Sequence, residues 1–151
     1  MLNIRDASEK DIKIIKFLED RAFLQDAYDV DMLLTAILES DGMSVIAEFD
    51  GEPAGYSIAI GMANRKADIE SICVDPEFRG KGIGMMLLSS IEQKMKERGF
   101  TESVLEVREH NRSAIAMYEK AGYILVKRLT NFYIGEFEGS RDAIRMKKSL
   151  R

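Results

Sequence analysis

A glycine-rich segment, Val74–Gly84, carries the residues whose types and spacing best suit the binding of an anion. It reads VDPEFRGKGIG and lies between an apolar, strand-like run and a segment with helical apolar spacing that begins at Ile83. Glycine lets a backbone approach a ligand closely. The first N–H groups of a helix have no intrahelical partners and lie at the positive end of the helix dipole. Because Arg79 and Lys81 add positive charge, the segment predicts a phosphate-binding loop.

Spacing excludes the two most familiar nucleotide loops. A Walker loop needs Gly-Lys followed by Ser or Thr, but Lys81 is followed by Gly82. A dinucleotide loop needs a third glycine where this chain has Met85 or Leu87. The loop therefore binds another kind of phosphate, or it is an ordinary turn between a strand and a helix.

Two glutamates on neighbouring predicted strands are candidates for proton transfer. Glu106 has the apolar neighbours Leu105 and Val107, and a carboxylate buried in such a strand needs a partner and often has a shifted pKa. It is either a functional carboxylate or a structural one bound by the backbone or by an arginine. Glu70 alternates with Ile69 and competes with Glu106 as base, substrate ligand or solvated side chain.

Two other reactive side chains have simpler interpretations. His110, the only histidine, lies one residue before a predicted helix cap and is expected to be an exposed loop residue. Cys73 lies inside a predicted strand and is expected to be a buried, unreactive thiol. The sequence offers no cluster of metal ligands, so we predict no metal site.

The elements of the N-terminal half follow from periodicity and turn residues. Alternation predicts strands, 3.6-residue spacing predicts helices, and Asp50-Gly51 predicts the turn of a hairpin. Ser8 and Asp11 form a capping box before the first helix. The predicted elements are a strand at Leu2–Ile4, a helix at Ile12–Ala22, a loop or short helical turn at Phe23–Asp29, a helix at Asp31–Ser40, and strands at Val45–Phe49, Tyr56–Gly61 and Asp68–Val74.

The C-terminal half contains a strand, a helix and a strand in succession, which implies a parallel crossover. Asn111 caps a second helix that ends before Gly122. The basic segment Arg145–Arg151 is interpreted as a solvated strand end. The elements expected here are a helix from Ile83 to Arg98, a strand at Ser103–Arg108, a helix ending at Ala121, a strand at Tyr123–Arg128, and a closing pair of Phe132–Ile134 with Ala143–Lys148.

This order predicts an α/β (α+β) fold with a mixed, mostly antiparallel sheet and a central parallel β-α-β crossover. At 151 residues, 46% of them apolar, we expect one domain spanning residues 1–151. A net charge of −4 gives no reason to expect nucleic acid or an anionic membrane as partner. A single cysteine and no signal-like or membrane-spanning segment predict a cytoplasmic protein, either monomer or homodimer.

Two segments resemble the GNAT superfamily of N-acetyltransferases. Arg79-Gly80-Lys81-Gly82-Ile83-Gly84 is similar to the motif with which that family holds the pyrophosphate of acetyl-CoA. The second segment, Leu105–Tyr123, is similar to the RimI-like and archaeal branch that acetylates protein N-termini. The resemblance covers essentially the whole chain and implies the GNAT fold, with its sheet splayed beside the crossover to hold acetyl-CoA.

The resemblance also implies roles for individual residues. Backbone groups of Ile72, Cys73 and Val74, and the side chain of Asn111, would bind the pantetheine arm, while Arg79, Gly80, Lys81, Gly82, Ile83 and Gly84 would hold the pyrophosphate. Tyr118 would lie near the sulfur and protonate the leaving thiolate, and Glu106 would help deprotonate the amine. Phe23, Tyr28, Glu70, Phe132 and Tyr133 would contact the acceptor.

The implied reaction is direct acetyl transfer from acetyl-CoA to the α-amine of a protein or peptide. This chain has Phe132-Tyr133 where the branch often has two tyrosines. The preference of this protein among acceptor N-termini is therefore open. Two alternative reactions are transfer to a polyamine and transfer to a lysine side chain. Glu136 and Glu138 would favour a polyamine if they face the acceptor. A further alternative is a module that binds acetyl-CoA without turnover. Retention of Glu106 and Tyr118 argues against the last.

Overall fold

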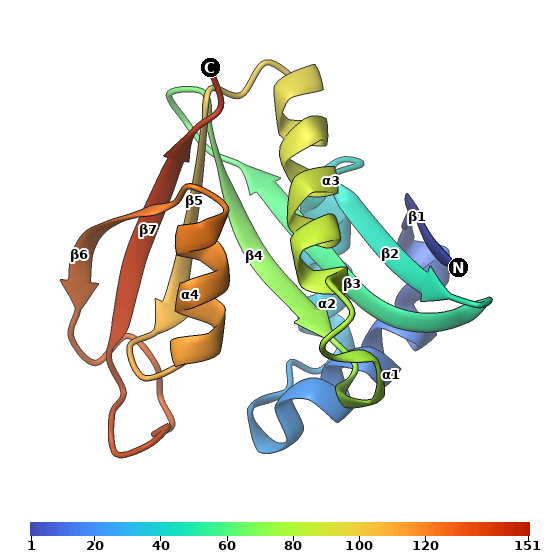
Figure 1. Cartoon of the computed structure of the whole chain (residues 1–151), viewed down its shortest axis with the longest axis horizontal. Helices are drawn as coiled ribbons and strands as arrows, with labels where there is room; N and C mark the ends of the chain where they lie inside the picture. The colour runs from blue at the N-terminus through green and yellow to red at the C-terminus, as the bar shows by residue number, and fades with distance from the viewer.

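A seven-stranded mixed sheet with strand order β1-β2-β3-β4-β5-β7-β6 forms the centre of the molecule (Figure 1). The computed structural model describes the backbone of residues 1–151 and every side chain except that of Gln25. The strands are β1 (Leu2–Asp6), β2 (Ser44–Phe49), β3 (Glu52–Gly61), β4 (Lys66–Val74), β5 (Glu102–Arg108), β6 (Ile124–Leu129) and β7 (Ala143–Ser149). Only β4 and β5 pair in parallel; the other neighbours are antiparallel.

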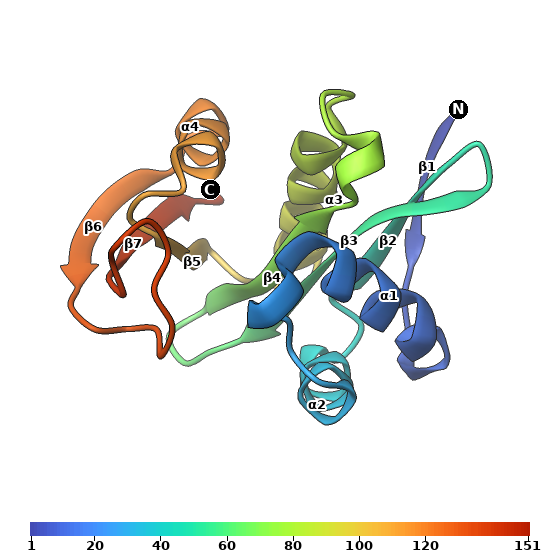
Figure 2. The same ribbon diagram turned by 90° about the horizontal axis from the view of Figure 1, so that it is seen from below.

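Helices cover both faces of this sheet. They are α1 (Ile12–Phe23), α2 (Val30–Ser40), α3 (Ile83–Glu97) and α4 (Arg112–Lys120), with short 3-10 turns η1 (Glu9–Asp11), η2 (Leu24–Asp26) and η3 (Pro76–Phe78). Seen from below, α3 and α4 lie on one face and α1 and α2 on the other (Figure 2). Among the described residues, no helix is both long and apolar enough to cross a bilayer.

Each face of the sheet has its own apolar core. Leu87, Ile91 and Leu105 belong to the core under α3 and α4, whereas Leu18 and Ile58 belong to the core under α1 and α2. The sheet is therefore anchored from both sides, and side chains of one strand alternate between two different environments.

Local capping signals begin the helices where the sequence predicts them. The predicted capping box is confirmed: the Asp11 carboxylate accepts a hydrogen bond from the Ser8 N–H at 3.0 Å, and the Ser8 hydroxyl accepts one from the Lys10 N–H. Asp29 caps α2 by accepting a hydrogen bond from the Met32 N–H at 2.9 Å. These caps satisfy donors that the first turn of a helix leaves free.

The predicted parallel crossover and the antiparallel run β2-β3-β4 are confirmed, but the predicted closing pair is wrong. Strand β7 pairs with β5 on one side and β6 on the other, so neither edge is free for a third strand. Phe132–Ile134 instead lies in the loop after β6, where Asn131 adopts a positive φ of 54° and turns the chain.

The interpretation of Arg145–Arg151 as a solvated strand end is also wrong. Because β7 lies between β5 and β6, its side chains reach charges on other elements. Arg145 binds Glu106, and Lys148 binds Glu92, both at 2.9 Å.

Candidate active site

The two parallel strands of the sheet separate halfway along their length. Ladder pairs run from Lys66 opposite Glu102 to Ile69 opposite Leu105, and none follows in the described backbone. Glu70 is an extra residue in the pairing of β4 with β3, because Ala59 pairs with Ile69 and Ile58 with Ser71. A bulge bends its strand, and the ribbons of β4 and β5 diverge from this level (Figure 1). The expected splay is confirmed, and Glu70 lies at the bulge instead of in a regular alternation.

The edge of β4 that faces the splay keeps backbone hydrogen-bonding groups free. Ile72, Cys73 and Val74 pair with Ser57, Tyr56 and Gly55 of β3 on their other side. Such groups need partners, and an extended chain lying beside β4 could bind them. Cys73 itself is buried at 5% exposure, and burial raises the pKa of its thiol, as expected for an unreactive cysteine.

The glycine-rich loop leads directly from β4 to the start of α3. Gly80 and Gly82 have φ of 80° and 78°, and a Cβ at either would meet no atom within 4 Å. Gly82 is the N-cap of α3 and makes no side-chain capping bond, so the first N–H groups of α3, which begins at Ile83, are available to an anion. Exposed Arg79 and Lys81 flank this cradle, with the Lys81 ammonium 5.0 Å from the Phe49 ring centroid.

Gly84 has a packing role that the sequence does not reveal. A Cβ at this position would lie 2.8 Å from the Met117 sulfur of α4. Glycine therefore lets the Met117 side chain of α4 lie against the first turn of α3.

An ion pair ties this loop to α1. Arg21 donates hydrogen bonds to the Asp75 carboxylate through Nε and through Nη2, the latter at 3.2 Å, while Asp75 accepts another from the Glu77 N–H at 2.9 Å. Asp75 is only 2% exposed, and its hydrogen bonds from Arg21 hold its pKa below the usual value. The carboxylate thus stays charged and fixes η3, the turn that precedes the glycines.

Helix α4 places a buried phenol next to the splay. Asn111 begins the helix, since its side chain accepts a hydrogen bond from the Ala114 N–H at 3.3 Å, which confirms its predicted capping role. Tyr118, 5% exposed, packs edge-on against Tyr123 at 5.8 Å between centroids. Burial raises the pKa of Tyr118, and its hydroxyl has no hydrogen-bond partner among the described residues. It is therefore a protonated donor without an acceptor.

Glu106 points to the opposite face of β5 from Tyr118. Leu105 and Val107 pack with Tyr118 in the core under α3 and α4, so the residue between them faces α1 and α2. Arg145 of β7 donates a hydrogen bond to Glu106 Oε2 at 2.9 Å. The carboxylate thus has an arginine partner, and its second oxygen remains free to accept a proton.

A third carboxyl, missed by sequence reasoning, joins Glu106 and Glu70. Asp68 precedes the bulge on β4, and burial followed by the charges of Glu106 and Glu70 raises its pKa to about 9. The signal was present in the sequence, because Asp68 lies in a strand between apolar Ala67 and Ile69 in the same way as Glu106 does in β5.

The predicted acceptor residues Tyr28 and Tyr133 come from distant segments but approach the same carboxyls. Burial raises the pKa of Tyr28, with further contributions from Glu19, Glu70 and Asp68. Burial also raises the pKa of Tyr133, to about 12, and Tyr28 and Glu106 act on it in the same direction. Both tyrosines therefore lie in the neighbourhood of these carboxyls.

Arg108, which the sequence did not single out, bridges the segments that carry these tyrosines. Its guanidinium lies 4.0 Å from the Tyr133 ring centroid, donates to the Gly135 carbonyl at 2.9 Å and reaches the Asp26 carboxylate at 3.5 Å. We call Asp26–Tyr28 and Phe132–Gly135 the two lips. Phe132 packs edge-on against Tyr133 at 5.0 Å.

Other candidates lie outside this group. Phe23 ends α1 with its side chain partly exposed, and it takes part in none of the contacts that join the lips. Glu136 is exposed, and Glu138 pairs with Arg112 of α4. His110 lies in the turn before α4, about a third exposed, as expected for a loop residue.

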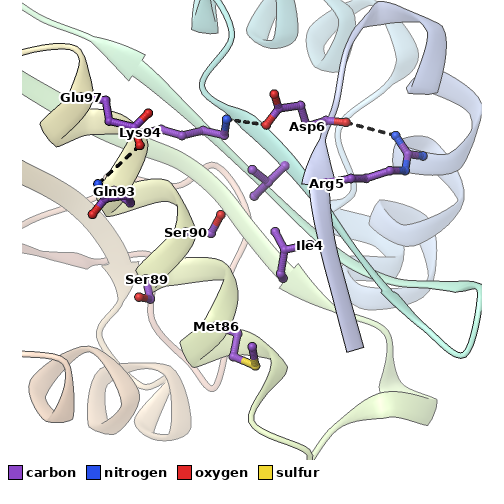
Figure 3. Close-up of a pocket in the computed structure, with 10 residues that line it drawn as sticks. Ile4, Arg5, Asp6, Met86, Ser89, Ser90, Gln93, Lys94 and Glu97 are labelled. Atoms are coloured by element: carbon purple, nitrogen blue, oxygen red, sulfur yellow. Dashed lines mark hydrogen bonds and ion pairs between the residues drawn. The ribbon is translucent and has the colours of Figure 1, made fainter. Parts of the chain in front are cut away.

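A cavity of about 450 Å³ lies elsewhere, between β1 and α3 (Figure 3). Ser89, Ser90 and Gln93 line its helical side, and Lys94 crosses it to pair with Asp6 of β1. Its lining includes none of the predicted site residues, so the splay and this cavity are separate features.

Comparisons with known proteins agree with this geometry. A family model described as Acetyltransferase (GNAT) family matches residues 10–123. The chain belongs to the GNAT family of acetyltransferases. An N-alpha-acetyltransferase of Sulfurisphaera tokodaii is 35% identical over 143 residues, covering 86% of this chain and 84% of the relative.

Two solved structures share the fold over nearly the whole chain. The ribosomal-protein-S18-alanine N-acetyltransferase of Escherichia coli has a TM-score of 0.90 at 26% identity, covering 99% of this chain and 94% of that one. The structure of yncA from Salmonella typhimurium with its cofactor acetyl-CoA has a TM-score of 0.82 at 20% identity, covering 100% of this chain and 95% of that one. The fold and the acetyltransferase activity expected from the sequence are thus confirmed.

Acetyl-CoA is the acetyl donor of this enzyme, and the residues present fit it. The open cradle at Gly80 and Gly82, the uncapped start of α3 and the free edge of β4 follow one another along the splay. They would accept a pyrophosphate and an extended, amide-bearing arm in that order. When bound, the donor supplies an acetyl group activated as a thioester.

Proposed function

We propose that this GNAT enzyme transfers acetyl to the N-terminal α-amine of a protein or peptide. The observation that carries the proposal is the bridge of Arg108 between the two lips. Because Arg108 bridges the two lips, the entrance suits a peptide that enters by its N-terminal end. A lysine inside a polypeptide would instead bring peptide chain to the entrance on both sides of the acceptor amine. The names of the Sulfurisphaera tokodaii and Escherichia coli relatives support the same acceptor class.

The two faces of β5 divide the acid–base work. Glu106 faces α1, α2 and the tyrosines of the lips, so it takes the proton from the incoming amine on that side. Tyr118 lies on the other face, so its hydroxyl donates a proton to the thiolate as that group leaves. Placing base and acid on opposite faces of β5, beside the splay, suits a transfer in which the amine enters as the thiol departs.

The acceptor is distinguished by a matched set of peptides. We expect CoA release, followed with a thiol reagent, for a peptide with a free N-terminus and an internal lysine, and mass spectrometry should place acetyl on the α-amine. The same peptide with a blocked N-terminus should be inert. Modification of the lysine in both peptides would contradict the proposal.

A polyamine is the second candidate, because three carboxyls, Asp68, Glu70 and Glu106, lie beside the lips. Spermidine in the same assay tests it. A kcat/KM for spermidine above that of the best peptide would assign the small amine as substrate.

A further inference from the structure

The carboxyl of Asp68 is the one described side chain with a buried polar atom that lacks a hydrogen-bond partner. Its Oδ1 is shut off from solvent and meets no donor. Asp68 pairs with Val104 in the parallel ladder, one position before the last pair, and so lies where β4 and β5 begin to separate. A buried carboxylate without a donor is unfavourable, whereas a neutral carboxyl carries its own proton to donate.

The groups that face Asp68 are acceptors. Glu70 follows on β4, and Glu106 extends from β5 on the same face; both lie within hydrogen-bonding reach of Asp68. The arginine beside them, Arg145 of β7, is bound to Glu106 Oε2. Tyr28, from the segment before α2, also lies near these carboxyls: burial raises the pKa of Tyr28, and Glu19, Glu70 and Asp68 act in the same direction.

The remaining charges near the cluster do not change this arrangement. Arg108 of β5 is directed to the lips through Asp26 and Gly135. Tyr133, from the other lip, interacts with Glu106 and Arg108. Three carboxyls thus meet on one face of the splay, and hydrogen bonds among them require a proton on one member.

We propose that Asp68 is a positioning residue of the acceptor site: as a neutral carboxyl it donates its one O–H hydrogen bond to the carboxylate of Glu106, beside that of Glu70, and holds Glu106 in place to receive the proton of the amine. Arg145 holds Glu106 from β7 and Asp68 holds it from β4. The bulge at Glu70 brings the third carboxyl into the same cluster.

The burial of Asp68 and its like-charged neighbours agree with this assignment, since they raise its pKa to about 9. Loss of this proton at high pH leaves three carboxylates that repel one another. Glu106 then loses its support from β4. The catalytic part of the inference rests on the proposed function, whereas the protonation of Asp68 does not.

The protonation state of Asp68 is measured in the absence of any peptide or amine substrate. Protein labelled with ¹³C at the aspartate side-chain carboxyls is titrated by NMR, and the resonance missing from Asp68→Asn is that of Asp68. We expect a midpoint above pH 8 and a lower midpoint in Glu106→Gln, where one repelling charge is gone. A midpoint below pH 5 would overturn the inference even if α-amine acetylation is established.

The positioning role is measured by the pH profile of kcat. Asp68→Ala should lower kcat at pH 7 about tenfold, because Glu106 loses a neutral donor. Asp68→Asn, whose amide also donates a hydrogen bond, should keep most of the natural activity at pH 7. The natural enzyme should lose kcat above about pH 9, and Asp68→Asn should not show this fall. If Asn is as impaired as Ala, Asp68 works as an ionised group and the inference fails.

An unchanged profile in both variants would also contradict it. Should no peptide be acetylated by the natural enzyme, the proposed function fails, and the NMR titration still decides the protonation of Asp68.

Discussion

Two buried phenols, Tyr118 and Tyr123, pack against each other but differ in their hydrogen bonds. The Tyr123 hydroxyl donates to Glu92 at 2.8 Å and shares a hydrogen bond with Ser103 at 2.7 Å, which makes it part of a closed network. The Tyr118 hydroxyl has no partner in the described part of the chain and lies beside the splay. The difference supports a structural role for Tyr123 and the proposed proton donation by Tyr118.

Substituting each tyrosine by phenylalanine separates these roles. Tyr118→Phe should lower kcat about 100-fold, because a positioned general acid contributes on that order, with little change in thermal unfolding. The matched variant Tyr123→Phe should lose about 1–3 kcal/mol of stability, since it leaves buried partners unsatisfied, and keep its kcat. Full turnover by Tyr118→Phe at saturating acetyl-CoA across pH would refute the acid assignment.

Prediction from sequence worked for residues whose signals are local. Asn111 is recognisable as a cap, and Cys73 as a buried strand residue, from their immediate neighbours. The partners of Glu106 and of the lips could not be predicted, because Arg145 is 39 positions from Glu106 and Arg108 is 82 positions from Asp26. Pairs so distant in sequence are set by strand register, which composition and periodicity do not determine.

At the scale of elements, the junction of β4, the glycine loop and α3 is the part proposed to bind the donor. Gly82→Ala places a Cβ at a positive φ in the cradle and should raise the Kd for acetyl-CoA about tenfold, or about 1.4 kcal/mol. Gly99→Ala is the matched control, because Gly99 has a φ of 85° and equal space but follows the far end of α3.

Both variants should lose about 1–2 kcal/mol of stability from the strained backbone. Equal Kd values for acetyl-CoA, measured by calorimetry, would show that the cradle does not hold the donor.

The Arg21–Asp75 pair links α1 to this junction and should make stability depend on pH. Because the folded state lowers the pKa of Asp75, its ionised form stabilises the protein above the unfolded value of about 3.9, and this contribution is lost as the pH falls through the lower, folded pKa.

We therefore expect Asp75→Asn to lower Tm at pH 7 by several degrees and the difference from the natural protein to shrink towards pH 3. Thermal unfolding followed by circular dichroism at a series of pH values measures this difference in Tm. Asp20→Asn, which removes an exposed i,i+4 pair with Lys16, should change Tm little at any pH. A difference between Asp75→Asn and the natural protein that stays constant down to pH 3 would contradict this linkage.

Element prediction succeeded where capping and periodicity agree and failed after β6. The crossover β4-α3-β5 follows from a strand, a helix and a strand in sequence. Phe132–Ile134 has the composition of a strand, but both edges of β7 are already occupied, and this competition for edges cannot be seen in the local sequence.

At the scale of the whole molecule, the proposed acceptor entrance is assembled from two segments that are far apart in the sequence. Arg108 of β5 joins Asp26, near the N-terminal helices, to Gly135, before the last strand. A monomer or homodimer that binds no nucleic acid stays a prediction.

Removing this bridge should affect the acceptor and spare the donor. Arg108→Ala should raise the KM for a peptide about tenfold and leave the Kd for acetyl-CoA unchanged, as steady-state kinetics and calorimetry would measure. Arg112→Ala, which removes an exposed arginine bound to Glu138, is the control and should change neither constant. Equal effects of Arg108→Ala on both constants would point to a general loss of structure.

The most direct test of the central claim is a crystal structure with CoA joined through an acetyl linker to the N-terminus of a short peptide. The pantetheine arm should lie between β4 and β5, the pyrophosphate at Gly80 and Gly82, and the peptide between Tyr28 and Tyr133, with the linked nitrogen near Glu106 and the sulfur near Tyr118. A peptide bound outside the lips, or a sulfur on the same side of β5 as Glu106, would contradict the account.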